Sequence, residues 1–286
     1  MDSASARSAP RRRVLDPMNL LALERISKAF GDRVLWEAVS ADVPHQARIA
    51  LVGEPSSGVT TLLRVLAGRE APDRGRVQTT RNLRVGWPSA AAFRRGEGEL
   101  TVRAYCLQTF ARLHAQELAL TRLEHELGDP HRTADLLPKF GSLQEDFETQ
   151  GGTTYRAQAR KVMDGLGFRA TFGDRVLGEL AAEGRMRARL ARVLLEDPDL
   201  LILDQPARSM PADTAAWLAG WLREWPGAVV CATPAAAELE ADLDSIWQLT
   251  PEGVEVFPRV RNASPENLRM PSMSNRASES DRSNSV

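Results

Sequence analysis

The chain has 286 residues, of which 43% are hydrophobic and 26% charged, and its formal net charge is −1. This composition is typical of a globular protein with one or two domains, and the near-neutral charge gives no general reason to expect a nucleic-acid partner. No apolar run approaches the roughly 18 residues that a membrane span needs, so we expect no membrane segment. We also expect no secretory signal, and therefore a cytoplasmic location. The two cysteines, Cys106 and Cys231, lack metal-ligand spacing and are expected to be buried, reduced thiols.

The first third of the chain predicts strands around one short helix. Residues 1–17 are rich in Ser, Ala, Arg and Pro and are expected to be disordered. Two strands joined at Gly31-Asp32 follow, with Phe30 just before the turn. The predicted strands are 20–26, 34–43, 48–53, 75–77 and 83–86, and the predicted helix is about 60–67.

The loop between the third strand and this helix is the most informative local motif. It reads Gly53-Glu54-Pro55-Ser56-Ser57-Gly58-Val59-Thr60-Thr61. An apolar strand that ends in such a loop and opens into a helix directs backbone N–H groups and the positive end of the helix dipole at one place, which favours an anion. The spacing is that of the phosphate-binding P-loop, G-x-x-x-x-G-K-[ST], except that Val59 replaces the lysine. By itself the match leaves open a plain strand-turn-helix joint.

The middle of the chain predicts a helical hairpin. Apolar residues at helical spacing run from Thr101 to about Leu127, and a second helix is expected from about 131 to 148. The hairpin carries more acidic than basic residues, which favours a solvated charged surface over a strong grip on RNA. Further helices are predicted at 156–166 and 184–195.

The last third returns to buried strands. Residues 200–204 form a continuous apolar run that ends in Asp204, the pattern of a strand buried on both faces of a parallel sheet. A buried carboxylate is costly without a partner or ligand, so Asp204 is a candidate functional residue. A helix at about 212–224, a strand at 228–232 and a closing pair at 246–249 and 254–257 follow, before a low-complexity tail.

This order of motifs resembles the nucleotide-binding domain of ATP-binding-cassette (ABC) proteins over about residues 18–258. The residues that carry the resemblance are the loop, the helix and turn that follow it (61–68 and 72–75), and Glu196 to Pro206 around the acidic strand. The resemblance implies an α/β fold: a P-loop NTPase core with a small antiparallel β subdomain and an α-helical subdomain, inserted at about 101–170. Residues 1–17 and 259–286 are then disordered extensions.

Within that superfamily, residues 144–160 together with Gly165-Leu166-Gly167-Phe168 look like the segment between the helical arm and the signature region of ABC-F proteins. ABC-F proteins are soluble and have no membrane domain. They usually carry two such domains in tandem, whereas this sequence holds one copy followed by a low-complexity tail.

The sequence departs from the family pattern mainly at reactive positions. The family's Leu-Ser-Gly-Gly-Gln signature falls on residues 180–184, which read Leu-Ala-Ala-Glu-Gly. The other departures are Ser56 for a loop glycine, Val59 for the P-loop lysine, Ser89 or Ala90 for a glutamine, Gln205 for the catalytic glutamate, Pro211 for an aspartate and Thr233 for the switch histidine.

The resemblance assigns the remaining candidate site. ATP would be held by the loop residues 53–61 with Phe30 stacked on adenine, and Mg²⁺ by Thr60 and Asp204. Gln205 and Thr233 occupy the degenerate catalytic positions. Two plainer interpretations stay open at this point: Thr60 and Thr61 as ordinary first-turn helix residues, and Phe30 as a core residue.

The leading functional hypothesis is a degenerate ABC-F-like protein that binds ATP weakly, is impaired in hydrolysis and acts through protein contacts. Its expected partner is a second ABC domain, either another copy of the chain or an intact ATPase. Two alternatives belong to other classes: a slow ABC-F ATPase that acts on the ribosome, and the nucleotide-binding subunit of a transporter, against which the ABC-F-like segment argues.

Overall fold

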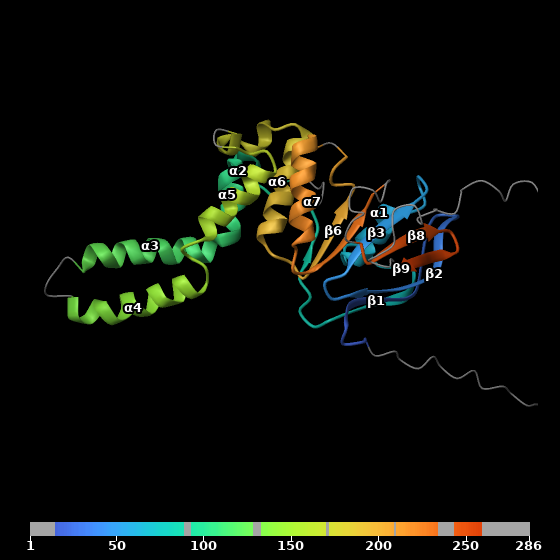
Figure 1. The fold of residues 1–286 in the computed structure, drawn as a ribbon, viewed down its shortest axis with the longest axis horizontal. Coiled ribbons are helices and arrows are strands. Elements are labelled where there is room, and N and C mark those ends of the chain that lie inside the picture. Colours follow the sequence, from blue (N-terminus) through green and yellow to red (C-terminus); the bar gives the residue numbers. More distant parts are fainter. Residues whose placement is uncertain are drawn as a thin grey trace, which may run out of the picture.

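The structure, a computed structural model, describes residues 15–88, 93–127, 133–169, 172–208, 210–233 and 243–258. Two sheets pack together at one end of the molecule, a group of helices covers the main sheet, and a pair of long helices extends away from both (Figure 1). The expectations for both tails, for the glutamine position at 89–90 and for the turn of the helical hairpin fall wholly or mainly outside the described residues.

A small antiparallel sheet is built from the N-terminal strands. Its order is β2-β1-β4, formed by β1 (Asn19–Phe30), β2 (Arg33–Pro44) and β4 (Arg74–Thr79). The β1–β2 turn lies at Gly31-Asp32, so Phe30 and Arg33 are directly opposite residues at the end of the hairpin. This is the predicted β subdomain.

The main sheet has the order β5-β6-β7-β3-β8-β9. Its strands are β3 (Arg48–Gly53), β5 (Val85–Gly86), β6 (Leu200–Asp204), β7 (Ala228–Ala232), β8 (Ser245–Thr250) and β9 (Gly253–Pro258). All neighbours are parallel except β8 and β9, which form the predicted closing pair. Because parallel strands end at the same edge, the carboxyl ends of β3, β6 and β7 lie together there.

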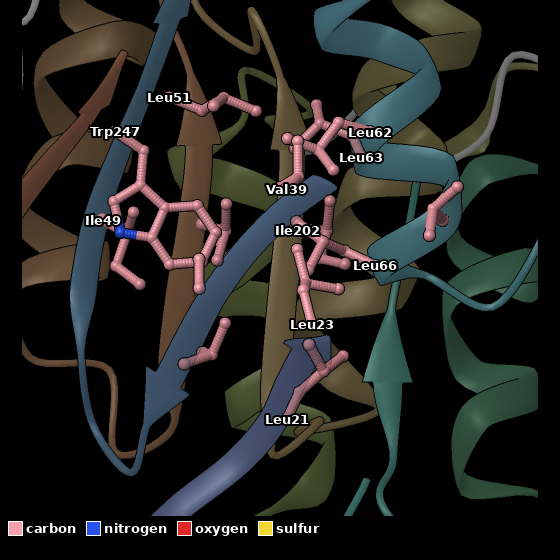
Figure 2. Packing of buried hydrophobic residues seen from close by; sticks show 14 of the residues in the cluster. Leu21, Leu23, Val39, Ile49, Leu51, Leu62, Leu63, Leu66, Ile202 and Trp247 are labelled. Atoms are coloured by element: carbon pink, nitrogen blue, oxygen red, sulfur yellow. The ribbon is translucent and has the colours of Figure 1, made fainter. Parts of the chain in front are cut away.

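The first hydrophobic core fills the space between the two sheets around α1 (Val59–Leu66). Figure 2 shows Leu62, Leu63 and Leu66 of α1 directed at side chains from β1, β2 and β6. Leu62 and Leu63 are fully buried and Leu66 is 2% exposed. Burial of a leucine side chain stabilises a fold by about 1.5 to 3 kcal/mol, so this face fixes α1, and with it the loop before it, against the sheet.

The second core joins the other face of the main sheet to the helices. These are α2 (Val102–Leu107), α5 (Tyr155–Gly165), α6 (Ala182–Leu195) and α7 (Ala212–Arg223). Leu201, Leu203, Val229 and Cys231 of the sheet belong to this core. Both cysteines are free and buried, as expected.

The long helices α3 (Ala111–Glu126) and α4 (Thr133–Thr149) form the predicted hairpin, which projects from the helical region (Figure 1). The hydrophobic spacing predicted one helix from 101 to 127, but a 3-10 turn at Gln108–Phe110 divides it. Leu113, Leu120 and Leu136 are buried, whereas Leu118 and Leu137 are about half exposed, at 47% and 58%. The hairpin therefore has little core of its own.

A polar cluster joins α3 of this hairpin to the start of α5. Glu117 on α3 accepts hydrogen bonds from Arg156 Nη2 at 2.6 Å and from the Tyr155 hydroxyl at 2.7 Å, and it lies 3.2 Å from His114 Nδ1. The Arg156 bond, followed by those from Tyr155 and His114, lowers the pKa of Glu117 to about 2. His114 lies one helical turn before Glu117 on the same face of α3, as residues three apart on a helix do.

The architecture is a P-loop NTPase fold with a small antiparallel β subdomain and an α-helical subdomain, as the family resemblance implied.

Candidate functional site

The loop from Gly53 to Gly58 has the backbone of an anion cradle. Gly58 has φ of 94° and Ser56 of 67°, both left-handed, and the N–H of Ser57 donates to the carbonyl of Glu54 at 3.0 Å. Gly58 is the N-cap of α1 and brings no capping side chain. The N–H groups of the first turn of α1 therefore keep their capacity for an external acceptor.

Close packing beneath the loop explains its second glycine. A Cβ on Gly58 would lie 2.9 Å from Leu35 Cδ1 and 3.0 Å from Trp36 Nε1, too close for a real side chain. Trp36 is fully buried, and its Nε1 has no hydrogen-bond partner among the described residues. The β subdomain is thus pressed directly against the loop, which leaves it little freedom to collapse.

Val59, at the lysine position, is part of the packing instead of the cradle. Its side chain is half-buried and packs against the first core, and a Cβ on Gly53 would lie 2.8 Å from Val59 Cγ2. The only charged side chain between residues 53 and 61 is that of Glu54, which is exposed and negative. The loop offers dipoles to an anion but no positive side chain of its own.

Thr60 and Asp204 meet across the edge of the sheet. The Thr60 hydroxyl donates to Asp204 Oδ2 at 2.8 Å, which joins the first turn of α1 to the end of β6. Thr60 is exposed and Asp204 is half-buried, whereas the side chain of Thr61 is 8% exposed and faces the interior. The bond supplies the partner that a carboxylate at the end of a buried strand needs. A hydroxyl and a carboxylate side by side are oxygen ligands of the kind that Mg²⁺ prefers.

Phe30 lies at the end of the β1–β2 hairpin and is 53% exposed, which excludes the plain core interpretation. Lys28 Nζ lies 5.6 Å from its ring centroid. Sequence reasoning missed the residue opposite, Arg33, whose Nη2 donates to the carbonyl of Ser56 in the loop at 2.9 Å. A basic residue just past the hairpin turn was the available signal.

Gln205 and Thr233, which the resemblance places at the catalytic positions, lie at the same edge of the main sheet. Gln205 follows β6, has φ of 46°, and donates its N–H to the carbonyl of Ala232 at 2.9 Å. Thr233 follows β7, is 7% exposed, and donates its N–H to the carbonyl of Leu51 at 3.3 Å. Gln205 Oε1 also lies 3.4 Å from Arg208 Nη1, a second basic neighbour that the sequence did not suggest. Neither Gln205 nor Thr233 can take a proton from water near neutral pH.

The signature-like segment, Leu180 to Gly184, lies at the start of α6. Leu180 is buried, and Ala181 caps the helix without a side-chain hydrogen bond. Glu183 is exposed in the first turn, where a negative charge stabilises the helix through its dipole. The substitution that would repel a phosphate thus suits the helix itself. Pro211 is the N-cap of α7 and likewise has no side-chain hydrogen bond.

The residues fit a magnesium nucleotide in part. The uncapped first turn and the buried Ser57 Oγ, which has no hydrogen-bond partner among the described residues, suit phosphate oxygens. The described residues hold no group of three or more His, Cys, Asp and Glu, so Mg²⁺ would rest on Thr60, Asp204 and the phosphates themselves. That is how proteins commonly hold Mg²⁺ with a nucleotide.

The fold and the loop at its sheet edge define a P-loop nucleotide-binding domain of the ATP-binding-cassette class. The family described as ABC transporter matches residues 36–208, which is more than half of the chain. The chain belongs to that family. Its members are ATP-binding domains that generally use Mg²⁺ and pair with other ABC domains. No helix in the described part of the chain is long and apolar enough to cross a membrane.

Relatives include ABC-F proteins. The chain is 30% identical over 211 residues to ABC transporter F family member 5 of Arabidopsis thaliana, covering 71% of this chain and 30% of the relative. It is 26% identical over 225 residues to the energy-dependent translational throttle protein EttA of Mycobacterium tuberculosis, covering 75% and 38%. The chain therefore spans less than half the length of either relative.

Among solved structures, a nucleotide-free ATP-binding cassette from an ABC transporter matches with a TM-score of 0.55 at 19% identity. The match covers 84% of this chain and 92% of the other. At this identity the likeness concerns the fold alone, which agrees with the layers and the sheet order described above.

Proposed function

We propose that residues 18–258 are an ABC-F-type domain that binds Mg-ATP weakly, hydrolyses it very slowly or not at all, and acts through contacts with a second ABC domain. The observation that carries the proposal is the combination at α1: the Thr60–Asp204 bond is kept, while Val59 turns the lysine position into core packing. A charge-assisted hydrogen bond contributes about 1.5 to 3 kcal/mol, so its loss weakens binding by about tenfold or more without abolishing it.

Slow hydrolysis follows from the two positions at the ends of β6 and β7. Gln205 can orient a water molecule but cannot accept its proton, and Thr233 offers a hydroxyl where the family has an imidazole. Loss of a general base typically reduces the rate by about 10² to 10⁴.

The ABC-F assignment is supported by the relatives and by the helical hairpin of α3 and α4, which projects from the helical subdomain. In the family that the chain resembles, the signature of one domain completes the nucleotide site of its partner. Glu183 would bring a negative charge toward a partner's phosphate, so pairing with an intact ABC ATPase, or with a second copy, would yield at best an asymmetric or slow site.

Calorimetric titration of the purified full chain with Mg-ATP tests the proposal. The expected dissociation constant for Mg-ATP is in the high-micromolar range. If Phe30 and its neighbours select the base, titration with Mg-GTP should give no measurable heat of binding. A sub-micromolar dissociation constant for Mg-ATP would contradict weak binding, and no binding up to millimolar nucleotide would contradict a nucleotide site altogether.

A second candidate is a slow ATPase that acts on the translation machinery, which the similarity to the translational throttle protein EttA favours. ATP-dependent co-sedimentation of the chain with ribosomes, at a rate of hydrolysis that ribosomes increase, would support it. If the chain is absent from the ribosome fraction both with and without ATP, this second candidate is contradicted. A transporter subunit would instead be recovered with a membrane-domain partner in the membrane fraction.

A further inference from the structure

We propose that Arg33 supplies, from the β subdomain, the positive charge for the nucleotide's phosphates that the P-loop of this chain lacks. The inference rests on the proposed function, since it assigns a residue to the same site. Its starting point is the hydrogen bond from Arg33 Nη2 to the carbonyl of Ser56, 2.9 Å long, which places a guanidinium against the loop.

The hairpin geometry places Arg33 beside the base-binding position. Phe30 and Arg33 are paired across β1 and β2, and directly opposite residues of an antiparallel pair project from the same face. Arg33 contacts the loop, so the exposed ring of Phe30 lies on the loop side of the hairpin as well. A nucleotide with its base on Phe30 and its phosphates at the start of α1 would therefore lie next to the guanidinium of Arg33.

The guanidinium has donors to offer. Arginine carries five N–H donors and stays charged, and the bond to Ser56 uses one of them with a neutral acceptor. A second basic residue of the hairpin, Lys28, is committed elsewhere: it lies 3.0 Å from Asp73 and 3.1 Å from Glu70. Arg33 thus has unused capacity for phosphate oxygens where Lys28 does not.

A purely structural role makes a different prediction. Ser56 has a left-handed φ of 67°, and a bond to its carbonyl could simply hold the loop in shape. Such a structural hydrogen bond would stabilise the free protein, and removing Arg33 would then lower Mg-ATP affinity equally with valine or lysine at position 59. If Arg33 instead replaces the missing charge, removing it should lower the affinity less once a lysine is present at position 59.

The experiment measures Mg-ATP and adenosine affinity by equilibrium dialysis, which reaches millimolar dissociation constants, for the full chain and five variants. Arg33→Ala should weaken Mg-ATP binding about tenfold or more and leave adenosine binding within twofold. Arg33→Lys should retain most of the affinity. In the Val59→Lys background, Arg33→Ala should cost threefold or less. Arg81→Ala, an exposed arginine in the turn before β5, is the matched control and should change nothing.

The melting temperature of each variant without nucleotide is the second readout, and it should be unchanged for Arg33→Ala. If Arg33→Ala binds Mg-ATP with an affinity within twofold of the unmodified chain, the proposed role of Arg33 is overturned while the proposed function stays intact. An equal loss in both backgrounds, together with a lower melting temperature, would assign Arg33 to loop structure and overturn the proposal too. If the unmodified chain binds no Mg-ATP, the proposed function and this inference both fail.

Discussion

Replacing Val59 with lysine should strengthen nucleotide binding and weaken the free protein at the same time. Val59 is half-buried, and complete burial of a valine contributes about 1.5 to 3 kcal/mol. A lysine keeps part of this contact through its methylene groups but adds a positive charge at the start of α1, where the helix dipole disfavours it by about 0.3 to 1 kcal/mol. We expect the unfolding free energy of the nucleotide-free protein to fall by about 1 to 2 kcal/mol.

The gain in binding is larger than this loss. A charge-assisted bond to phosphate oxygens contributes about 1.5 to 3 kcal/mol, which corresponds to an affinity for Mg-ATP about 10- to 150-fold higher. At one nucleotide concentration well above both dissociation constants, ligand binding stabilises the variant by about 1.5 to 3 kcal/mol more than the unmodified protein, which exceeds the expected loss over most of the two ranges. Val59→Lys should therefore melt below the unmodified protein without nucleotide and above it with saturating Mg-ATP.

Thermal unfolding with and without Mg-ATP, combined with calorimetric titration, measures both effects. Val59→Met is the matched control, because it keeps an apolar contact without a charge, and its affinity should stay within twofold. If Val59→Lys binds Mg-ATP no more tightly than Val59→Met, the loop is not a phosphate site and the reasoning from the P-loop is wrong.

Two further predictions concern the helical subdomain. Gly165→Ala should lower the unfolding free energy in urea by about 3 kcal/mol, because a Cβ there would lie 1.9 Å from Trp217 Cε2; adding Trp217→Ala should cost less than the sum of the two single changes. Glu117→Gln should lower stability at pH 7 by about 1 kcal/mol, since the carboxylate is a third exposed. Its folded-state pKa is depressed to about 2 from 4.5, so its contribution is present above about pH 4.5 and is lost as the pH falls toward 2. The difference from the unmodified protein should therefore narrow over that range, and a constant difference would refute the cluster as its source.

Local patterns predicted the elements of the fold well, because each has a signal in its own residues. The buried strand at 200–204 and the strand at 228–232 are continuous apolar runs, and the structure places them side by side in the main sheet. The periodicity of residues 101–127 predicted helix correctly but not the 3-10 turn at Gln108–Phe110, since helical spacing continues through such a short irregularity.

The contacts around the candidate site were less predictable, because they join residues far apart in the chain. The Thr60–Asp204 bond spans 144 positions, and the bond from Arg33 to Ser56 depends on how the hairpin packs on the loop. Neither leaves a periodic signal in the sequence. The motif spacing predicted the location of the candidate phosphate loop, whereas the packing of Val59 against the first core became visible only in the structure.

The central claim is that this domain keeps a nucleotide-binding scaffold in which the chemistry at the γ-phosphate is impaired. Phosphate release from Mg-ATP tests it most directly, measured for the purified chain, for Gln205→Glu and for the triple variant Val59→Lys, Gln205→Glu, Thr233→His. We predict little or no release by the unmodified chain and by the single variant, and a measurable rate only for the triple variant, because the three positions act as one unit. Turnover by the unmodified chain at about 1 s⁻¹, within the usual range of enzymes, would contradict the account.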